Sequence, residues 1–374
     1  MGYAIVGAGS FAQFCLQQYM DIENLRLVAV WNRTFAVAER IAKQYGAHAY
    51  KRLEDLLDNP DVQIVHLGST PARHAKQGLL ALSKGKHVLS EKPLATYLDD
   101  ARQMIQLANS RNLQLIVNFV MRYAPIAQTV KTLMDAKILG MPLRGSYINC
   151  ACDTDLPLEH WFWNEKESGG IFVEHGVHFF DLVSYWLGEG TVLHASRFKR
   201  PRTSIVDQVS CEVQHGAQTT VNYYHGFHQT EHFDQQDFRL ICERGQVIIK
   251  NWIPSDIVIH AVLSHAQIEQ LATIFPDAEI TTLREFTGND RTVLRRHRPE
   301  AIDCEILLQW KDSRDKLTLY GNAVRMLMQD FMRSIQNPHY VPRITAEDGY
   351  CALQLAIQAT QVAKEVVLRR ERKH

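Results

Sequence analysis

The first twelve residues place a glycine-rich turn directly after a short apolar run, and this arrangement constrains the fold more than any other stretch. Residues 3–6 are apolar throughout, as expected for a strand buried on both faces. Residues 7–12 read Gly-Ala-Gly-Ser-Phe-Ala, and apolar residues then recur at helical spacing. In such a unit Gly7 permits the sharp turn, Gly9 lets a pyrophosphate approach the backbone, and Ala12 allows close helix–strand packing. The pattern predicts a dinucleotide site at a helix N-terminus.

The overall composition leaves room for two domains and excludes several classes of protein. The chain has 374 residues, and its 41 basic residues balance 41 acidic ones, so no charge field recruits nucleic acid or a membrane. No apolar run reaches spanning length, and the first strand begins at Tyr3, which leaves no space for a signal peptide. The seven cysteines lack metal-type spacing. We therefore expect a cytoplasmic protein with reduced thiols and no bound metal.

The residues after the second predicted strand bear on which dinucleotide is bound. The apolar-rich run 25–30 precedes Asn32 and Arg33, about 20 residues past the glycine turn. An acidic residue at this place would hold the ribose hydroxyls of NAD. Asn32 can instead donate to a 2′-phosphate, and Arg33 can pair with that phosphate or stack on adenine. The sequence favours NADP(H) over NAD(H), against the alternative that Arg33 is only a solvated loop charge.

The third predicted strand leads to a helix beside the expected cofactor site. The apolar run 64–67 is followed by Thr70 and Pro71, a pair typical of a helix N-cap and first turn. This helix would open at the carboxyl edge of the parallel sheet. We expect His74, in its first turns, to pack or cap near the nucleotide rather than to do chemistry.

The fourth predicted strand ends in a charged pair and a proline. The run 87–90 is followed by Glu91-Lys92-Pro93, and Pro93 is a candidate for a cis peptide bond. A lysine at the carboxyl end of a central strand points into the crevice where α/β sheets bind ligands. An ordinary surface lysine fits this setting poorly.

One predicted helix of the second half carries ionisable residues in an apolar setting. Glu174, His178 and Asp181 are spaced so that they share one stripe of a helix over 171–187. A carboxylate beside a histidine can orient the imidazole, which makes His178 a candidate general acid/base. The alternative is a structural histidine capped by Asp181, and the presence of Lys92 favours the catalytic interpretation.

These motifs together resemble one enzyme family. Glu91-Lys92-Pro93, following the N-terminal glycine motif, resembles the glucose–fructose oxidoreductase/inositol dehydrogenase/rhizopine-catabolism (Gfo/Idh/MocA) family. Residues 118–125 resemble that family's crossing into a second domain, and residues 342–349 resemble the start of its closing helix. Residues 168–181 resemble its Gly-Gly…Asp-x-Gly-x-His-x-x-Asp helix, with Glu174 where many members carry Asp.

The resemblance implies an α/β fold class with two domains. Residues 1–119 would form a Rossmann domain with a doubly wound parallel sheet. Residues 120–374 would form an α+β domain with a large, mostly antiparallel open sheet, and short β-rich runs between 145 and 250 agree with it. Helices from about residue 320 would pack back on the first domain. A homo-oligomer, dimer or tetramer, would form through the C-terminal sheet.

The resemblance also implies a reaction, namely hydride transfer between nicotinamide and a carbinol or carbonyl carbon of a sugar, sugar derivative or cyclitol. His178 would remove the hydroxyl proton, Lys92 would hydrogen-bond the same oxygen, and Glu174 would position the substrate or tune His178. Two alternatives are a redox-neutral NAD-dependent glycosidase and a non-catalytic nucleotide-sensing regulator of the same family.

The expected site residues fall into three sets. The catalytic set is Lys92, His178 and Glu174. The cofactor-binding set is Gly7, Gly9, Ser10, Phe11, Ala12, Asn32, Arg33, Ser69, Thr70, Pro71, His74, Glu91, Lys92, Pro93 and Arg122. The substrate-binding set is Lys92, Arg122, Trp161, Trp163, Glu174 and His178. Two assignments have equal alternatives: Arg122 could instead form a domain-linking salt bridge, and Trp161 and Trp163 could be core rather than a stacking wall for a sugar ring.

Other parts of the second half carry less specific signals. His225 and His228 fall on opposite faces of a predicted strand, which argues against zinc binding with His232 and favours one of them lining the substrate pocket. Residues 255–318 are charge-mixed and read as an elaboration of the second domain. A last helix is expected over 350–367, followed by the basic tail 369–374.

Overall fold

The computed structural model describes residues 1–366, which fall into two compact units that each combine distant parts of the chain. The first unit comprises Met1–Tyr123, Leu158–Asp181 and Leu317–Gln361. The second comprises Ala124–Pro157, Leu182–Lys316 and the residues from Val362. Leu158–Asp181 and the closing helices thus pack with the nucleotide-binding segment.

The first unit is built on a six-stranded parallel sheet in the order β3-β2-β1-β4-β5-β6. The chain leaves β1 toward both edges, so the order reverses between β1 and β4, the position at which doubly wound sheets bind ligands. This confirms the predicted Rossmann-type sheet. Its strands are β1 (Gly2–Val6), β2 (Arg26–Trp31), β3 (His48–Tyr50), β4 (Ile64–Leu67), β5 (His87–Ser90) and β6 (Leu115–Val117).

The helices between these strands follow the expected alternation. Every residue of β4 is buried, as the continuous apolar run predicted, because helices cover both faces of such a sheet. The helices are α1 (Ser10–Tyr19), α2 (Phe35–Tyr45), α3 (Leu53–Leu57), α4 (Pro71–Ser83) and α5 (Leu98–Ser110).

Two closing helices, α10 (Lys316–Gln336) and α11 (Ala346–Val362), also belong largely to the first unit. The ring of Tyr320 lies 5.6 Å from that of Phe11 and 5.2 Å from that of Phe14 in α1. A Cβ added at Gly349 would meet Val117 Cγ2 at 2.4 Å, so α11 approaches β6 closely. These contacts explain why the C-terminal helices pack with the N-terminal segment.

The last helix ends earlier than the expected residue 367. After Val362 the chain becomes extended, and β18 (Ala363–Glu365) pairs in parallel with residues 195–197 of β8 (Gly190–Lys199). This pairing supplies partners for backbone groups at what would otherwise be a sheet edge. The basic tail 369–374 lies outside the described residues.

The second unit contains a ten-stranded open sheet in the order β14-β17-β13-β12-β11-β7-β10-β9-β8-β18. Most neighbours are antiparallel; β7 with β10 and β8 with β18 are parallel. This confirms the predicted large, mostly antiparallel sheet. Its other strands are β7 (Pro142–Cys152), β9 (Val206–His215), β10 (Thr219–Gln229), β11 (Gln235–Cys242), β12 (Gly245–Lys250), β13 (Asp256–Leu263), β14 (Glu279–Glu285) and β17 (Cys304–Lys311).

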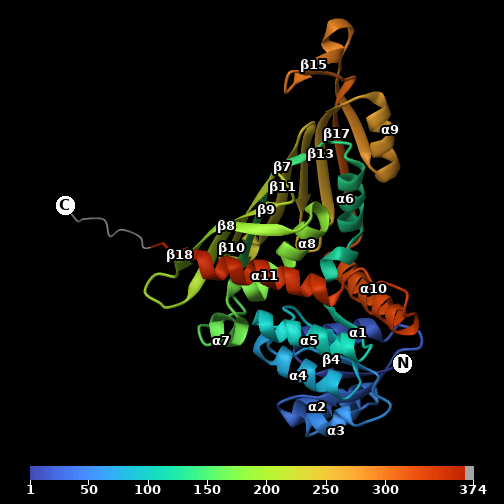
Figure 1. The fold of residues 1–374 in the computed structure, drawn as a ribbon, viewed down its shortest axis with the longest axis vertical. Helices are drawn as coiled ribbons and strands as arrows, with labels where there is room; N and C mark the ends of the chain where they lie inside the picture. The colour runs from blue at the N-terminus through green and yellow to red at the C-terminus, as the bar shows by residue number, and fades with distance from the viewer. Residues whose placement is uncertain (367–374) are drawn as a thin grey trace, which may run out of the picture. The chain divides into compact units, whose positions relative to one another are not determined.

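One face of this sheet is covered by helices and the other is more exposed. Burial alternates residue by residue along β9 and β13, the pattern of a sheet with one packed face. The helices α6 (Pro125–Ala136), α8 (Val177–Leu187) and α9 (His265–Ile274) lie along the same side of it (Figure 1). The ring of Trp186 in α8 lies 5.4 Å from that of Phe238, which marks the core between helix and sheet.

Residues 255–318 form the end of the sheet and a small hairpin. The strands β15 (Thr292–Arg295) and β16 (Arg298–Ala301) pair with each other beyond β14. Arg295 forms ion pairs with Glu243 (2.7 Å) and Glu300 (2.6 Å), so this part of the arginine cluster is matched by carboxylates. The segment elaborates the second unit, as predicted.

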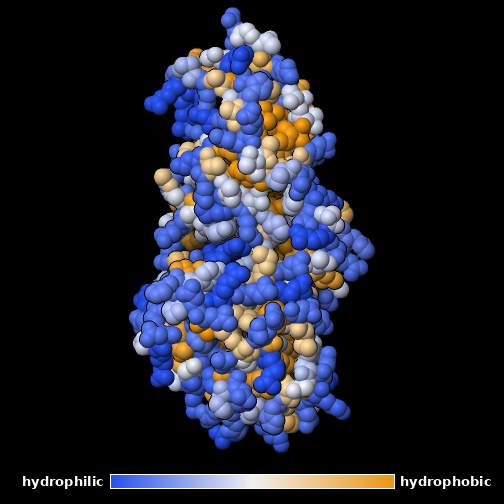
Figure 2. Space-filling view, turned by 90° about the vertical axis from the view of Figure 1, so that its right-hand side faces the viewer, coloured by the Kyte–Doolittle hydropathy of each residue, from blue (hydrophilic) through white to orange (hydrophobic). Residues whose placement is uncertain are grey.

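The surface mixes hydrophilic and hydrophobic residues. On the face shown in Figure 2, hydrophilic residues predominate and hydrophobic residues form scattered patches. In the part of the chain that the structure describes, no helix is both long and apolar enough to span a bilayer.

Candidate active site

The glycine turn has the geometry of a cradle for an anion. Gly7 has φ +91°, and a Cβ there would meet the Ser69 nitrogen at 2.6 Å, so only glycine fits. Around Gly9 a Cβ would meet no atom within 4 Å, which leaves the space in front of α1 open. Gly9 is also the N-cap of α1 and gives it no side-chain cap, so the first N–H groups of the helix are available to a phosphate.

The end of β2 opens into a basic cavity. Asn32 is held in place, because its Oδ1 accepts from Ala8 N (3.1 Å) and its Nδ2 donates to Thr34 O (3.1 Å). A cavity of about 550 Å³, a size typical of ligand sites, is lined by apolar side chains, two glutamates and four basic residues. Those that matter for charge are Lys51, Arg52, Arg73, Lys76, Glu54 and Glu167.

The start of α4 departs in one detail from the expectation. Thr70 occupies the N-cap position before Pro71, but its side chain makes no capping bond. Its hydroxyl instead donates to Glu167 Oε2 (3.4 Å), from a short helix, α7 (Glu165–Ser168), that packs on α4. The preceding Ser69 donates its hydroxyl to Gln77 (2.6 Å).

Lys92 lies at the carboxyl end of β5, followed by a cis bond to Pro93 as predicted. Its Nζ donates to Oε1 of Glu174 (2.5 Å) and to the Glu174 carbonyl oxygen (2.8 Å). The two side chains are only 17% and 11% exposed. A nearly buried ion pair of this kind needs the close, doubly bonded geometry seen here to offset its desolvation.

The helix that carries Glu174 and His178 is not regular. Phe172–Gly176 forms a π-helical turn that leads into α8, whereas the residue spacing predicted an α-helix throughout. Such turns recur at functional sites, because they shift side chains out of the α-helical register. Gly169 and Gly170, at φ +82° and +87°, bring the chain into this turn.

Both candidate catalytic segments belong to one compact unit. Glu174 and His178 fall within Leu158–Asp181, which packs with the segment that carries Lys92. Lys92, Glu174 and His178 therefore lie in the same compact unit, although the two segments that carry them are distant in sequence. His178 is buried, and its ring lies 6.3 Å from that of Phe119 and 6.4 Å from that of His175.

Arg122 is the centre of a buried ion-pair network. Its guanidinium donates twice to Asp181 (2.9 and 2.6 Å), once to Asp348 (2.9 Å) and once to the Arg343 carbonyl (3.2 Å). Burial lowers the pKa of Arg122, but the two carboxylates outweigh burial and raise it above its usual value. Arg122 thus forms salt bridges with Asp181 and Asp348, all within the first unit. Asp181 pairs with Arg122 rather than capping His178.

The tryptophans before the glycine pair differ in burial from the residue between them. Trp161 and Trp163 are half-buried in a short helical turn, whereas Phe162 is buried and packs against Trp163 with a centroid distance of 4.9 Å. Phe162 therefore supplies the core contact, and the two indoles keep exposed surface.

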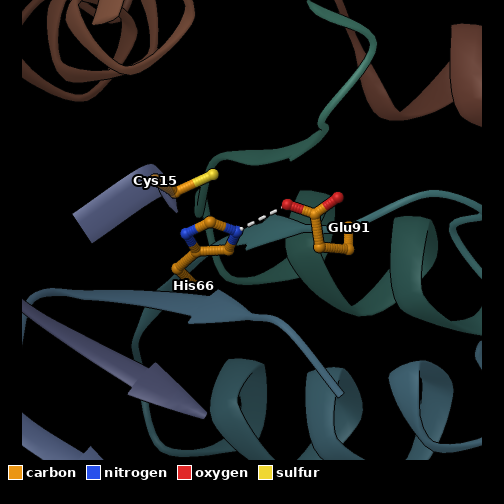
Figure 3. Close-up of side chains that lie close together, drawn as sticks. All are labelled: Cys15, His66 and Glu91. Carbon is orange, nitrogen blue, oxygen red and sulfur yellow. Dashed lines mark hydrogen bonds and ion pairs between the residues drawn. The ribbon is translucent and has the colours of Figure 1, made fainter. Parts of the chain in front are cut away.

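A buried cluster behind Lys92 escaped the sequence reasoning. Cys15, His66 and Glu91 place one donor atom each within 4.8 Å of one another, the single such group among residues 1–366 (Figure 3). His66 Nε2 bonds to Glu91 Oε1 (3.0 Å), which also accepts from Asn118 (2.6 Å). The signal was present, because a histidine in a fully apolar strand must find a buried partner.

These ligand types could hold a metal, but the arrangement fits a hydrogen-bond network better. His66 Nδ1 lies 3.3 Å from the Tyr19 hydroxyl, so both ring nitrogens already have protein partners. Burial raises the pKa of the Cys15 thiol well above its usual value, although hydrogen bonds with Tyr19 and Asn118 oppose the rise.

The histidines of β10 lie as the strand alternation predicted. His225 is fully buried on the helix-covered face, and His228 is exposed and bonds to the Tyr224 hydroxyl (2.6 Å). His232 lies beyond the strand with its side chain 85% exposed. Burial lowers the pKa of His225 to about 3, so this ring is neutral.

The sheet order, the glycine cradle and the open helix N-terminus define a dinucleotide-binding protein with a Rossmann fold. A model described as "Oxidoreductase family, NAD-binding Rossmann fold" matches residues 1–119, and the GFO/IDH/MocA C-terminal domain matches residues 127–248. Together the two matches cover more than half of the chain, which belongs to the GFO/IDH/MocA family of oxidoreductases.

Individual relatives are more distant. An uncharacterized oxidoreductase of Synechocystis sp. is 30% identical over 203 residues, which are 52% of this chain and 53% of that protein, so the chain spans about half its length. A dTDP-3,4-didehydro-2,6-dideoxy-alpha-D-glucose 3-reductase of Saccharopolyspora spinosa is 28% identical over 247 residues, 66% and 73% of the two chains.

The solved structures agree on the fold. A 3-ketoreductase from Actinomadura kijaniata, in complex with NADP and TDP-benzene, matches with a TM-score of 0.75 and 16% identity over 99% of both chains. At this identity the match establishes a shared fold alone.

Proposed function

We propose that this chain is an NADP(H)-dependent oxidoreductase that moves a hydride between nicotinamide and a carbinol or carbonyl carbon of a sugar-like substrate. The observation that carries the proposal is the Lys92–Glu174 ion pair at the carboxyl edge of the parallel sheet. A nearly buried ammonium at this edge is a preformed donor to an alcohol or carbonyl oxygen. The relatives named as sugar reductases make a sugar-like substrate the natural choice.

The residues present fit a dinucleotide. The open space at Gly9 and the uncapped start of α1 would take the pyrophosphate, and Asn32 would face the adenosine ribose. When bound, the nicotinamide ring accepts or supplies the hydride. The protein's part is to orient the substrate carbon and to move the hydroxyl proton.

In the oxidation direction His178 would accept the hydroxyl proton while the hydride leaves the same carbon, so that a carbonyl forms. Lys92 would hydrogen-bond the oxygen and stabilise the negative charge that develops on it. Glu174 would orient the Lys92 ammonium through two of its donors and leave the third for the substrate oxygen. Trp161 and Trp163 would provide the exposed aromatic surface against which a sugar ring stacks.

The preference for NADP(H) over NAD(H) is supported by charge at the end of β2. The cavity there has four basic and two acidic lining residues, and Arg33 is exposed beside it. A 2′-phosphate would gain charge-assisted hydrogen bonds from these groups, whereas the 2′-hydroxyl of NAD would gain little. No carboxylate stands at position 32 to favour NAD.

We also propose a homo-oligomer, dimer or tetramer, formed through the more exposed face of the ten-stranded sheet. Ile148 and Ile241 on neighbouring strands are 37% and 43% exposed there, as a face covered by a second copy would be. Light scattering coupled to size exclusion measures the oligomeric state, and Ile148→Glu should shift it to the monomer. A cytoplasmic location stays a prediction.

The test of the proposed function is a panel of sugars, sugar acids, cyclitols and nucleotide-activated ketosugars, each assayed with NADP(H) and NAD(H). We expect nicotinamide absorbance to change in step with product, faster with NADP(H). Release of free sugar without net change in absorbance would identify the redox-neutral glycosidase instead. Cofactor binding with no turnover across the panel would favour the non-catalytic regulator.

A further inference from the structure

The two residues that flank Lys92 in sequence are each bonded to a different buried histidine. Glu91, before it, bonds through its side chain to His66 (3.0 Å). Pro93, after it, accepts through its carbonyl oxygen from His74 Nδ1 (2.7 Å). Both histidines are completely inaccessible to solvent. Lys92 is thus the middle residue of a turn that is fixed on both sides.

The Glu91 side of the turn is anchored to α1 and β6. A carboxylate only accepts hydrogen bonds, so His66 must donate from Nε2, and its Nδ1 can then accept from the Tyr19 hydroxyl (3.3 Å). Asn118 donates to the same carboxylate oxygen (2.6 Å). Figure 3 shows the His66 ring next to Cys15 and bonded to the Glu91 carboxylate. The Glu91 carboxylate therefore has no freedom to rotate without breaking two buried bonds.

The Pro93 side of the turn is anchored to the nucleotide-binding loop. His74 Nε2 lies 2.9 Å from the carbonyl oxygen of Ser69, the residue whose backbone approaches Gly7. Carbonyl oxygens cannot donate, so a neutral ring donates to one carbonyl at a time, and the shorter contact, 2.7 Å, is the one to Pro93. Burial lowers the pKa of His74, while the carbonyls of Pro93 and Ser69 and the charge of Glu91 oppose that shift.

We propose that His74 and His66 are positioning residues that hold the Lys92 turn in register with Glu174, and that the His74 ring packs between this turn and the loop that receives the cofactor. The inference rests on the proposed function in taking Lys92 as the group that meets the substrate. It adds that the lysine is placed by two buried imidazoles rather than by its own strand alone. A displacement of about 1 Å at such a group can cost about 100-fold in turnover.

The two nitrogens of His74 can be tested separately. The amide nitrogen of asparagine lies near the position of a histidine Nδ1, and that of glutamine near Nε2. His74→Asn therefore keeps a donor for Pro93 and loses the one for Ser69, whereas His74→Gln does the reverse. In the same way His66→Gln keeps the donor to Glu91, and His66→Leu removes it. His87→Asn is the matched control, because His87 is a partly buried histidine at the opposite end of β5.

The measurement is the rate at which acetic anhydride acetylates Lys92 in the folded apoprotein, followed by mass spectrometry with Lys84 as internal reference. It needs neither cofactor nor substrate, so it decides the inference even if no sugar is turned over. Loss of the Pro93 bond in His74→Gln should raise Lys92 acetylation about fivefold, the population change expected for one typical hydrogen bond. His66→Leu should also raise it, while His74→Asn, His66→Gln and His87→Asn should stay near the wild-type rate.

Two outcomes would contradict a positioning role for His74 and His66. If Lys92 is acetylated at the wild-type rate in both His74→Gln and His66→Leu, or if acetylation follows the loss of thermal stability across all five variants, the histidines only stabilise the fold and the inference fails. Should His74→Gln not fold, the His66 pair gives the same decision. Where a substrate is in hand, His74→Gln should lower kcat, and His74→Asn should mainly raise KM for the cofactor.

Discussion

The carboxyl edge of the parallel sheet and the packed face of the ten-stranded sheet bury polar side chains in different ways. At the edge, charged groups are buried as ion pairs, Lys92 with Glu174 and Arg122 with Asp181. On the packed face, the central strands bury aromatic and neutral polar residues such as Tyr147, Tyr223 and His225. Charges held in a low-dielectric setting are costly to keep and are suited to chemistry, whereas neutral groups mainly shape a core.

The largest expected effect is the loss of activity when the Lys92 ammonium is removed. Lys92→Met keeps the side-chain length and removes the ammonium, so we expect kcat/KM on any active substrate to fall about 1,000-fold or more. Steady-state kinetics measures it. Lys84→Met, on the surface, and Tyr223→Phe, on the packed face, should keep turnover. Full activity in Lys92→Met would show that the buried charges at the carboxyl edge of the parallel sheet have no chemical role.

The second prediction compares the two regions by stability. Arg122→Met leaves Asp181 and Asp348 without their shared partner, and breaking a buried pair costs about 3–5 kcal/mol. Tyr223→Phe removes the neutral bond to His215 (2.7 Å), at about 1 kcal/mol. Urea unfolding of the two variants gives both numbers. Equal losses would mean that burying charge at the edge carries no special cost.

A third prediction sharpens the role of charge at the end of β2. Arg33→Ala should lower the ratio of kcat/KM for NADP(H) over NAD(H) about tenfold, because one charge-assisted bond to the 2′-phosphate is lost. Arg40→Ala, on the exposed side of α2, is the control. A wild-type protein that prefers NAD(H) would contradict the reading of Asn32 and Arg33.

The last prediction concerns pH. The folded pKa of His225, about 3, lies below the ordinary value of 6.5, so the unfolded state binds the extra proton first. Its contribution to stability is complete above pH 6.5 and is lost as pH falls, by about 1.4 kcal/mol per pH unit down to about pH 3. The difference between the unfolding free energies at pH 5 and pH 7 should be smaller in His225→Phe than in the wild type. His232→Gln, at the surface, should leave the pH slope unchanged.

The sequence predicted the parts of the molecule that are determined locally. The apolar run of β1 followed by Gly7 and Gly9 specifies a strand, a turn and a helix within ten residues. Likewise the cis bond before Pro93 and the alternation of β9 follow from short-range rules. The parallel sheet and the site segments could therefore be placed before any coordinates.

What could not be predicted depends on tertiary contacts. The reach of Glu174 to Lys92 depends on a longer side chain and a π-helical turn, and neither has a reliable spacing signature. The bond of His66 to Glu91 joins residues 25 positions apart, and the bond of His74 to Pro93 joins residues 19 positions apart. The strands of residues 255–318 could not be predicted, because charges in this segment are matched by partners such as Glu243, which is distant in sequence.

The π-helical turn at Phe172–Gly176 has a consequence for how this site could change over time. Such a turn accommodates one residue more than an α-helix would over the same length. Deleting a single codon there would restore the regular helix. It would also rotate the Glu174 carboxylate about the helix axis by about 100° relative to the His178 imidazole. One small indel could thus uncouple the two groups, a larger functional step than most point substitutions in the same helix.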